Sequence, residues 1–443
     1  KYTHYMNQRP ASTVIFADKF RYMTYRYSDN SLPMVLIIGA GFAGLELIKQ
    51  FNNKPFRVLL LDKNNYHTFQ PLLYQIASAG LTAESIAYPV RRKIGPYPNI
   101  AFRVAEVSSV DTSGQLVHTD IGEFHYDYLI IASGASTNFY GNNSLASTTF
   151  PLKSVQDALN MRTTILQQFE KAVNASKTNG SKLLNFIIVG GGPTGVELAG
   201  ALAEIKKNVV PSDYRELDPE MMEVHLIEAA PRVLGTMSEK SSRLAKKYLE
   251  QLGVKVWLNA VVNSYENDIL TLSNDTKITA HHVIWTAGVK GVDIKGLEGN
   301  IRTRGNRIIT DRYHRISGFE NIYAIGDIAS IQGDEQYPQG HPGVAQVAIQ
   351  QAHNLASNFI RNAKGKSIQA FNYHDKGSMA TIGRHKAVVD LPFISFGGYL
   401  AWYIWMFIHL MALVGFRNRF MVFMNWMWNY ITYDRALRLI LKK

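Results

Sequence analysis

Two glycine-rich segments of one pattern contain the residues best suited to hold phosphate groups. The first spans Val35–Gly44 and the second Phe186–Gly195. Each joins a short apolar run, typical of a buried parallel strand, to a segment with helical periodicity. The glycines allow a tight turn, close approach of the backbone to a pyrophosphate and close helix–strand packing, and the helix N-terminus offers N–H groups to the phosphates. Two such turns predict that the chain binds two dinucleotides at once.

An acidic residue ends the strand that follows each glycine turn. Asp62 lies eighteen positions after the first turn, and Glu228 lies thirty-three positions after the second. A carboxylate about 20 residues after the glycines accepts hydrogen bonds from ribose hydroxyls. Because it also repels a 2′-phosphate, NADH is favoured over NADPH. The spacing supports Asp62 better than Glu228, since the polar stretch 208–222 lengthens the second connection.

Composition limits the other chemistry available to the chain. Its 443 residues contain no cysteine, which excludes disulfides, thiolate metal sites and cysteine redox chemistry. The histidines lack metal-ligand spacing, so no metal site is expected. The net charge of +12 is concentrated at the ends, because residues 1–33 carry five Lys/Arg against two Asp and residues 417–443 carry six against one.

The apolar segment from Tyr399 to Phe416 indicates which class of partner the basic C-terminal end contacts. Four of the six tryptophans, Trp402, Trp405, Trp426 and Trp428, lie in or just after this segment. The neighbouring basic residues are Arg417, Arg419, Arg435, Arg438, Lys442 and Lys443. Aromatic and basic anchors of this kind are typical of helices that lie on a membrane surface. A buried core helix and, on length, a spanning helix are the alternatives. We expect two helices on the membrane rather than a span, and no nucleic-acid site.

Two matched small-residue turns indicate an internal duplication. One follows the strand ending near Ile131, and the other follows the strand ending near Trp285. A third strand, Ile322–Ile325, runs into Gly326-Asp327 and is expected to return to the first domain. The predicted fold class is therefore α/β, with two Rossmann-like dinucleotide-binding domains, the second inserted into the first, and a C-terminal amphipathic helical segment that anchors the chain to a membrane. The predicted boundaries are 1–33 for an extension outside the fold, 34–150 with 305–375 for the first domain, 151–304 for the second and 376–443 for the membrane segment.

From Met34 onward, the chain resembles the two-dinucleotide-domain flavoprotein reductases and, within them, the type II NADH:quinone oxidoreductases. The segments that carry the resemblance are Asn65–Gln75, Gly190–Gly200, Ala345–Gln351 and Gly415–Arg419. It implies that the first domain holds one non-covalent FAD and the inserted domain holds NADH. It also implies transfer of a hydride from NADH to FAD and of electrons from there to a membrane quinone, without proton pumping.

The glycine turns, their acids and the resemblance together give the expected binding residues. For FAD these are Gly39, Ala40, Gly41, Phe42, Ala43, Gly44, Asp62, Lys63, Val107, Ala132, Ser133, Gly134, Gly326, Asp327, Ala345 and Gln346. For NADH they are Gly190, Gly192, Pro193, Thr194, Gly195, Glu197, Glu228, Ala287 and Gly288. In the resemblance, Asp327 accepts from the ribityl chain of FAD, while a helix N-cap is the plainer interpretation.

Three residues are candidates for catalysis: Glu197, Gln346 and Gln350. In the resemblance Glu197 comes near the nicotinamide and the flavin, where it positions NADH or assists proton uptake by the quinone. Its plainer interpretation is an acid favoured at a helix start, since Glu46 holds the equivalent place after the first turn. Gln346 and Gln350 are four residues apart on an expected helix, so they share a face. Their neutral amides suit quinone carbonyl oxygens, although two glutamines on a helix need no function.

The expected partners are NADH, a membrane quinone and the bilayer surface, with a homodimer possible. The expected location is the cytoplasmic face of a bacterial inner membrane. Two other functional classes fit the glycine turns: a soluble FAD-dependent NAD(P)H reductase of another acceptor, and a non-enzymatic sensor that binds flavin and NADH. The lack of cysteine argues against disulfide substrates, and the aromatic C-terminal segment argues against a soluble protein.

Overall fold

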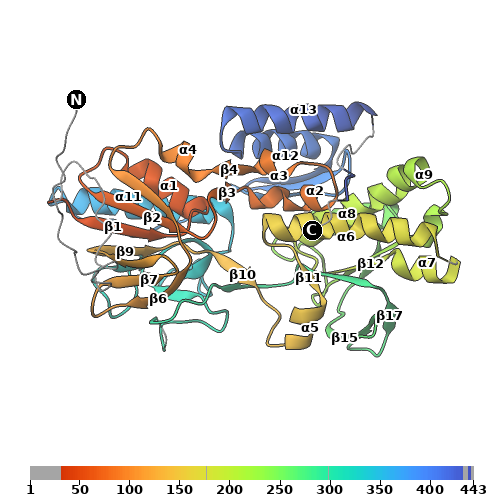
Figure 1. The fold of residues 1–443 in the computed structure, drawn as a ribbon, viewed down its shortest axis with the longest axis horizontal. Helices are drawn as coiled ribbons and strands as arrows, with labels where there is room; N and C mark the ends of the chain where they lie inside the picture. The colour runs from red at the N-terminus through yellow and green to blue at the C-terminus, as the bar shows by residue number, and fades with distance from the viewer. Residues whose placement is uncertain (1–30, 176, 298, 433–437, 441–443) are drawn as a thin grey trace, which may run out of the picture.

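The computed structural model describes residues 31–175, 177–297, 299–432 and 438–440. Residues 1–30 of the predicted extension, and Arg435, Lys442 and Lys443 of the predicted anchors, lie outside these ranges. Two α/β domains lie side by side, and a pair of helices, α12 and α13, packs along one side of the molecule (Figure 1).

The first domain is built on a parallel sheet of order β21-β9-β1-β2-β5. The strands are β21 Ile322–Ala324, β9 Tyr128–Ile131, β1 Met34–Ile38, β2 Arg57–Asp62 and β5 Ile100–Val104. Val35 and Ile37 pack beneath α1 (Phe42–Phe51) and α11 (Ala345–Asn362), and Leu36 faces the antiparallel sheet β6-β7-β8 on the other side. Because β21 pairs with β9, the third strand returns to this domain, as the sequence predicts.

The second domain repeats this plan with the sheet order β11-β18-β12-β13-β14. The strands are β11 Phe150–Pro151, β18 His282–Trp285, β12 Asn185–Val189, β13 Glu223–Ile227 and β14 Lys255–Trp257. The principal helices are α6 Val155–Val173, α8 Pro193–Glu204 and α10 Glu239–Gln251. In both domains the glycine turn follows the central strand of its sheet, so the two predicted Rossmann-like units are confirmed.

Two antiparallel strands, β10 (Ala135–Thr137) and β19 (Val289–Gly291), join the domains. After β19 the chain is already part of the first domain, because Ile294 and Leu297 are buried in the core that contains Leu36. The predicted boundary at 304 therefore lies about a dozen residues beyond the crossing. The small-residue turn ends the second domain structurally, and sequence periodicity did not mark that point.

The predicted C-terminal segment does not begin as helix. Residues 378–398 form an antiparallel sheet of β23 Ser378–Thr381, β24 Ala387–Leu391 and β25 Ile394–Gly398. The sequence predicts helices only from Tyr399 onward and no element for these residues; the β-branched pair Val388 and Val389 favours a strand there and is fully buried in the core shared with the second domain. Helices α12 (Tyr399–Ala412) and α13 (Phe416–Thr432) follow.

The C-terminal segment is bonded to both domains. Asn418 of α13 donates to the carbonyl oxygens of Glu84 and Ala87 in the first domain, at 3.2 and 3.1 Å. Asp390 of β24 accepts from the hydroxyls of Ser238 and Ser241 in the second domain, at 2.9 and 2.6 Å. One continuous segment therefore connects the two nucleotide-binding domains to each other.

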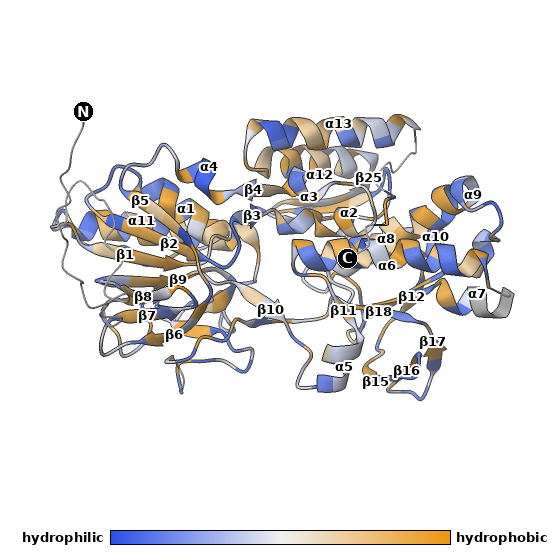
Figure 2. Cartoon of the chain, in the orientation of Figure 1, coloured by the Kyte–Doolittle hydropathy of each residue, from blue (hydrophilic) through white to orange (hydrophobic). Residues whose placement is uncertain are grey.

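Hydrophobic residues run along α12 and α13 (Figure 2). Among the helices within the described ranges, none combines the length and the apolar character needed to cross a bilayer.

Candidate functional site

The first and third glycines of the first turn, Gly39 and Gly44, have no room for a side chain. Gly39 has a φ of +107°, and a methyl group on it would overlap the carbonyl oxygen of Ala132. A methyl group on Gly44 would overlap the carbonyl oxygen of Gly39. The second turn repeats both features, with Gly190 at +110° and Gly195 against its carbonyl oxygen. Close packing therefore requires glycine at these four positions, whereas an added methyl group on Gly41 or Gly192 would meet no described atom within 4 Å. The open middle position leaves room for a phosphate group beside the N-terminus of the next helix.

The two acids occupy equivalent positions in the two domains, and each carboxylate accepts from the corresponding pair of backbone amides. Asp62 accepts from the amide of Ala40 at 2.7 Å and from that of Asn64 at 2.7 Å. Glu228 accepts from Gly191 at 2.5 Å and from Ala230 at 2.7 Å. The long spacing before Glu228 is taken up elsewhere, by a π-helical turn and a short helix between 205 and 213. Burial raises the pKa of Asp62, whereas the amides of Ala40 and Asn64 oppose that shift.

The crevice of the first domain fits FAD. Ala132, Ser133 and Gly134 follow β9, and the Ser133 hydroxyl is buried with no hydrogen-bond partner among the described residues. Asp327 lies in the turn after β21, where an added methyl group on Gly343 would be in ordinary van der Waals contact with its carboxyl, at 3.4 Å. Val107 opens β6 two residues after Ala105, whose amide binds the carbonyl of Asp62 at 2.9 Å. The orphaned Ser133 hydroxyl suits a polar ligand, and the Asp327 carboxyl suits the part of a ligand that offers hydroxyl donors.

Gln351, the last residue of the segment Ala345–Gln351, has a structural role that the sequence does not predict. Its side chain is buried on α11 and accepts from the amide of Gly326 at 2.6 Å. It therefore fixes the turn that carries Asp327. The sequence feature that could have pointed to Gln351 is its place next to Gln350 on the expected helix, where it lies on the inward face of α11.

Glu197 differs from its counterpart in the first domain. Glu46 lies near the surface, with His353 at 2.8 Å and Lys49 at 3.2 Å. Glu197 is buried on α8, and its carboxyl accepts from the amide of Thr381 at 3.4 Å. Loss of solvent raises the pKa of Glu197 to about 8, because the Thr381 amide and the Trp405 indole offset the desolvation only in part. Its carboxyl group is therefore mostly protonated at neutral pH.

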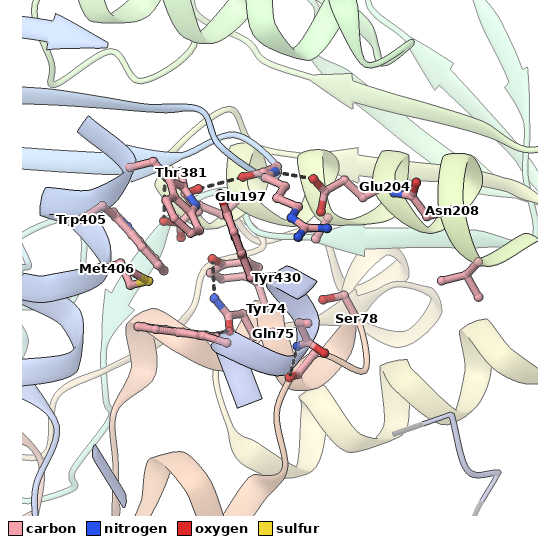
Figure 3. A pocket seen from close by; sticks show the side chains of 18 residues that line it. Tyr74, Gln75, Ser78, Glu197, Glu204, Asn208, Thr381, Trp405, Met406 and Tyr430 are labelled. Carbon is pink, nitrogen blue, oxygen red and sulfur yellow. Dashed lines mark hydrogen bonds between the residues drawn. The ribbon is translucent and has the colours of Figure 1, made fainter. Parts of the chain in front are cut away.

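Glu197 faces a cavity of about 130 Å³ between α8, β23, the short helix α2 (Leu73–Ala77) and the C-terminal helices. In Figure 3 the side chains of Tyr74, Thr381, Trp405 and Tyr430 surround it. On the opposite wall the indole N–H of Trp426 donates to Gln75 at 2.7 Å. The cavity thus combines flat aromatic walls with a neutral carboxylic acid, and it adjoins the helices predicted to touch a membrane.

Gln346 and Gln350 do not line this cavity. Gln346 donates to the carbonyl oxygen of Gly377 at 3.1 Å and accepts from the amide of Lys376 at 3.0 Å. Gln350 makes the same paired contact with the backbone of His374, at 2.9 and 3.0 Å. Both amides therefore hold the segment 374–377 that leads into β23. Gln346 binds Gly377 just before β23 and Glu197 binds Thr381 at its end, so the two side chains hold backbone groups roughly 13 Å apart along extended chain.

Comparisons with known proteins agree with this arrangement. Residues 33–352 match the family model described as pyridine nucleotide-disulphide oxidoreductase, and residues 375–433 match the NDH2 C-terminal domain. The chain is 34% identical over 422 residues to the type II NADH:quinone oxidoreductase Ndh of Mycobacterium tuberculosis, which covers 91% of this chain and 89% of that protein. The chain belongs to the type II NADH:quinone oxidoreductases. A family member from Staphylococcus epidermidis is 30% identical, covering 80% of this chain and 88% of that protein.

The fold of this type II NADH:quinone oxidoreductase is also that of a solved structure. The structure of NDH2 from Plasmodium falciparum in complex with NADH superposes with a TM-score of 0.85 at 23% identity, covering 93% of this chain and all of that one. The predictions of the family, of the fold class and of FAD and NADH as cofactor and substrate are confirmed.

The roles of individual side chains in this type II NADH:quinone oxidoreductase stay predictions, with revisions for two expected membrane anchors, Trp405 and Arg438. Trp405 was expected at the membrane surface with the other tryptophans, but it is 3% exposed and stands beside Glu197. Trp428 is 57% exposed. Arg438 was expected to be a membrane anchor, and its guanidinium is paired with Asp213 at 2.9 Å.

Proposed function

We propose that this chain oxidises NADH at the second glycine turn and reduces a membrane quinone in the cavity beside Glu197. The reaction consumes NADH, one proton and the quinone, yields NAD⁺ and the quinol, and pumps no protons. Bound FAD supplies the two-electron relay between the two substrates. The observation that carries the proposal is the buried, neutral Glu197 at a cavity walled by the membrane-facing helices.

NADH lies across the carboxyl ends of the strands of the second sheet. The N-terminus of α8, next to Gly192, receives the pyrophosphate, because its N–H groups point outward there. Glu228 at the end of β13 accepts from the adenosine ribose, which directs the nicotinamide half toward β18 on the other side of β12. Glu228 also excludes a 2′-phosphate by charge.

Glu228→Gln should therefore narrow the preference for NADH over NADPH. The amide keeps most of the shape but removes the negative charge, so the ratio of kcat/KM for NADH to that for NADPH should fall about tenfold, or roughly 1.4 kcal/mol. Steady-state kinetics with both coenzymes checks this. A wild type that already uses both equally, or a variant with an unchanged ratio, would contradict the assignment of Glu228.

The cavity provides what quinone reduction needs. NADH gives up two electrons and one proton as hydride, so the quinol takes one further proton from water. Glu197, protonated at neutral pH, donates a hydrogen bond and then this proton to a quinone oxygen, and it is recharged from solvent. Trp405, Tyr430 and Tyr74 offer ring faces to the quinone.

The outer faces of α12 and α13 form the membrane contact. The exposed apolar residues on the two helices are Tyr399, Leu400, Tyr403, Phe407, Ile408, Met411, Phe416, Phe420, Phe423, Met424, Met427, Trp428, Tyr430 and Ile431. Arg417 is exposed among them and adds attraction to anionic lipid. The chain is thus a membrane-associated enzyme whose quinone cavity adjoins the lipid. Because NADH is a cytoplasmic reductant, we place it on the cytoplasmic face of a bacterial inner membrane; assembly as a homodimer stays a prediction.

Gln346 and Gln350 act in the quinone half of the reaction, through the segment they hold. Gln350→Leu keeps the volume of the side chain but leaves the His374 amide and carbonyl without their partner, a loss of about 1 kcal/mol or more per bond. The segment before β23 should loosen, and flavin reoxidation by quinone should slow at least about fivefold.

Stopped-flow measurement separates the two half-reactions. Reduction of the flavin by NADH should stay close to wild type in Gln350→Leu, since NADH binds in another domain. Gln346→Leu should affect both steps, because Gln346 starts α11 next to the flavin crevice. Slowed reduction with normal reoxidation in Gln350→Leu would contradict a role of the segment 374–377 in the quinone half of the reaction.

A further inference from the structure

Tyr140 has an unusual backbone and an unusual location for an aromatic residue. Its φ is +53°, in the left-handed region that non-glycine residues rarely adopt, and its side chain is 69% exposed. A bulky residue in this conformation is strained and is held in it by its surroundings. The adjacent Phe139 instead packs on Trp285, with ring centroids 5.6 Å apart. The chain thus turns one aromatic ring inward and the next outward.

Several hydrogen bonds hold this conformation against the end of β18. The Asn138 amide donates to the carbonyl of Gly288 at 3.3 Å, and the Trp285 indole donates to the carbonyl of Asn138 at 2.9 Å. The Asn138 side chain then accepts from the amide of Tyr140 at 2.8 Å. The loop is therefore fixed to the small-residue turn that follows β18.

The side chain of Tyr140 lies directly on that turn. Gly288 has a φ of +70°, and a methyl group on it would overlap the hydroxyl of Tyr140 and lie 2.7 Å from its Cζ atom. The matched turn in the first domain ends at Gly134, with a φ of +72°, where an added methyl group would meet no described atom within 4 Å. The duplicated turns thus share a backbone and differ in that only the second has an aromatic ring laid over it.

The presence of the ring at only the second turn parallels a difference between the two ligands. FAD stays bound through many turnovers, whereas NADH enters and NAD⁺ leaves in each one. With Glu228 on the adenosine side of β12, the turn at Ala287–Gly288 lies on the nicotinamide side. We infer that Tyr140 is a binding residue for the nicotinamide half of NADH, with its ring forming the outer wall of that half of the crevice. This inference rests on the NADH site proposed above.

The test compares two replacements that remove the ring with one that keeps it. Tyr140→Leu should raise the KM for NADH about three- to tenfold, the range expected for one aromatic contact. Tyr140→Asn should do the same while keeping a residue that tolerates the left-handed backbone. Tyr140→Phe should stay within about twofold of wild type. Titration of NAD⁺ by calorimetry should show the same order of affinities, and the KM for a short-chain quinone and the FAD content should not change.

Two further variants make the outcome unambiguous. Phe393→Leu removes another fully exposed aromatic ring, at the tip of the β24–β25 hairpin, and should leave the KM for NADH unchanged. Glu228→Gln reports on the NADH site itself. If Glu228→Gln alters coenzyme preference while Tyr140→Leu leaves the KM for NADH within twofold, the inference about Tyr140 fails and the site stands. If neither changes coenzyme use, the NADH site is elsewhere and both assignments fall.

Discussion

Replacing Phe407, Phe420 and Phe423 together with glutamate should move the protein from the membrane fraction to the soluble fraction. Their side chains are 64%, 54% and 43% exposed on the outer faces of α12 and α13. Burial of each in lipid contributes about 1.5–3 kcal/mol. Loss of all three weakens partitioning by more than about a thousandfold, and the new charges weaken it further.

Sedimentation with lipid vesicles measures this effect, and flavin absorbance shows whether the variant still folds around FAD. A matched control places three glutamates at Asn143, Ala146 and Ser147 of α5 (Asn143–Thr148), on the side of the molecule away from α13 (Figure 1). That control should still sediment. High salt should weaken but not abolish the binding of the wild type, because only part of the attraction is electrostatic. Complete release of the wild type by salt, or sedimentation of the triple variant, would contradict insertion of these helices.

The wild type should lose stability as pH rises, and Glu197→Gln should remove most of that loss. The pKa of Glu197 is about 8 in the folded protein, against 4.5 in an exposed chain. Between these values the folded state keeps a proton that the unfolded state releases. Burial of Glu197 therefore costs the folded state no stability below about pH 4.5. The cost grows as pH rises from there to 8, and it is constant at higher pH. Its full size is roughly 5 kcal/mol, at 1.36 kcal/mol per unit.

The measurement is the thermal midpoint at pH 6 and pH 9 for wild type and variant. Glu197→Gln should be the more stable protein at both values, by roughly 2 kcal/mol at pH 6 and roughly 5 kcal/mol at pH 9, because glutamine resembles the protonated acid and has no proton to lose on unfolding. Glu46→Gln, at the equivalent place near the surface, should keep the pH dependence of the wild type. In Glu197→Gln, reoxidation of the flavin by quinone should also fall about a hundredfold, since glutamine cannot donate the proton. An unchanged pH profile with normal turnover would remove Glu197 from the mechanism.

Local patterns in the sequence were sufficient for the two nucleotide-binding domains. The conformation at Gly39 and Gly190 is imposed by a tight turn within a few residues, so glycine spacing predicts it. Asp62 was found for the same reason. The long spacing from the glycines made the prediction of Glu228 weaker than that of Asp62. The structure removes this objection, because the added residues 205–213 extend away from the strand that positions Glu228.

The quinone-side arrangement depended on contacts that no local pattern records. Trp405 meets Glu197 from a helix two hundred residues later in the chain, and the segment held by Gln350 lies twenty-four residues after it. The sequence predicted the helices from Tyr399 onward but no element for β23–β25, whose short strands pair only with one another among the described strands. No sequence pattern indicated a role for Tyr140, because the inferred role depends on its contact with Gly288 in the folded chain.

The C-terminal segment bonded to both domains has a mechanical consequence. Asn418 holds the backbone of the first domain and Asp390 holds the start of α10 in the second, so a change in the angle between the domains must strain or break bonds made by this segment. The same segment carries the helices that we propose contact lipid. Binding to a bilayer is therefore expected to restrict the angle between the domains and, with it, the separation of the two bound nucleotides.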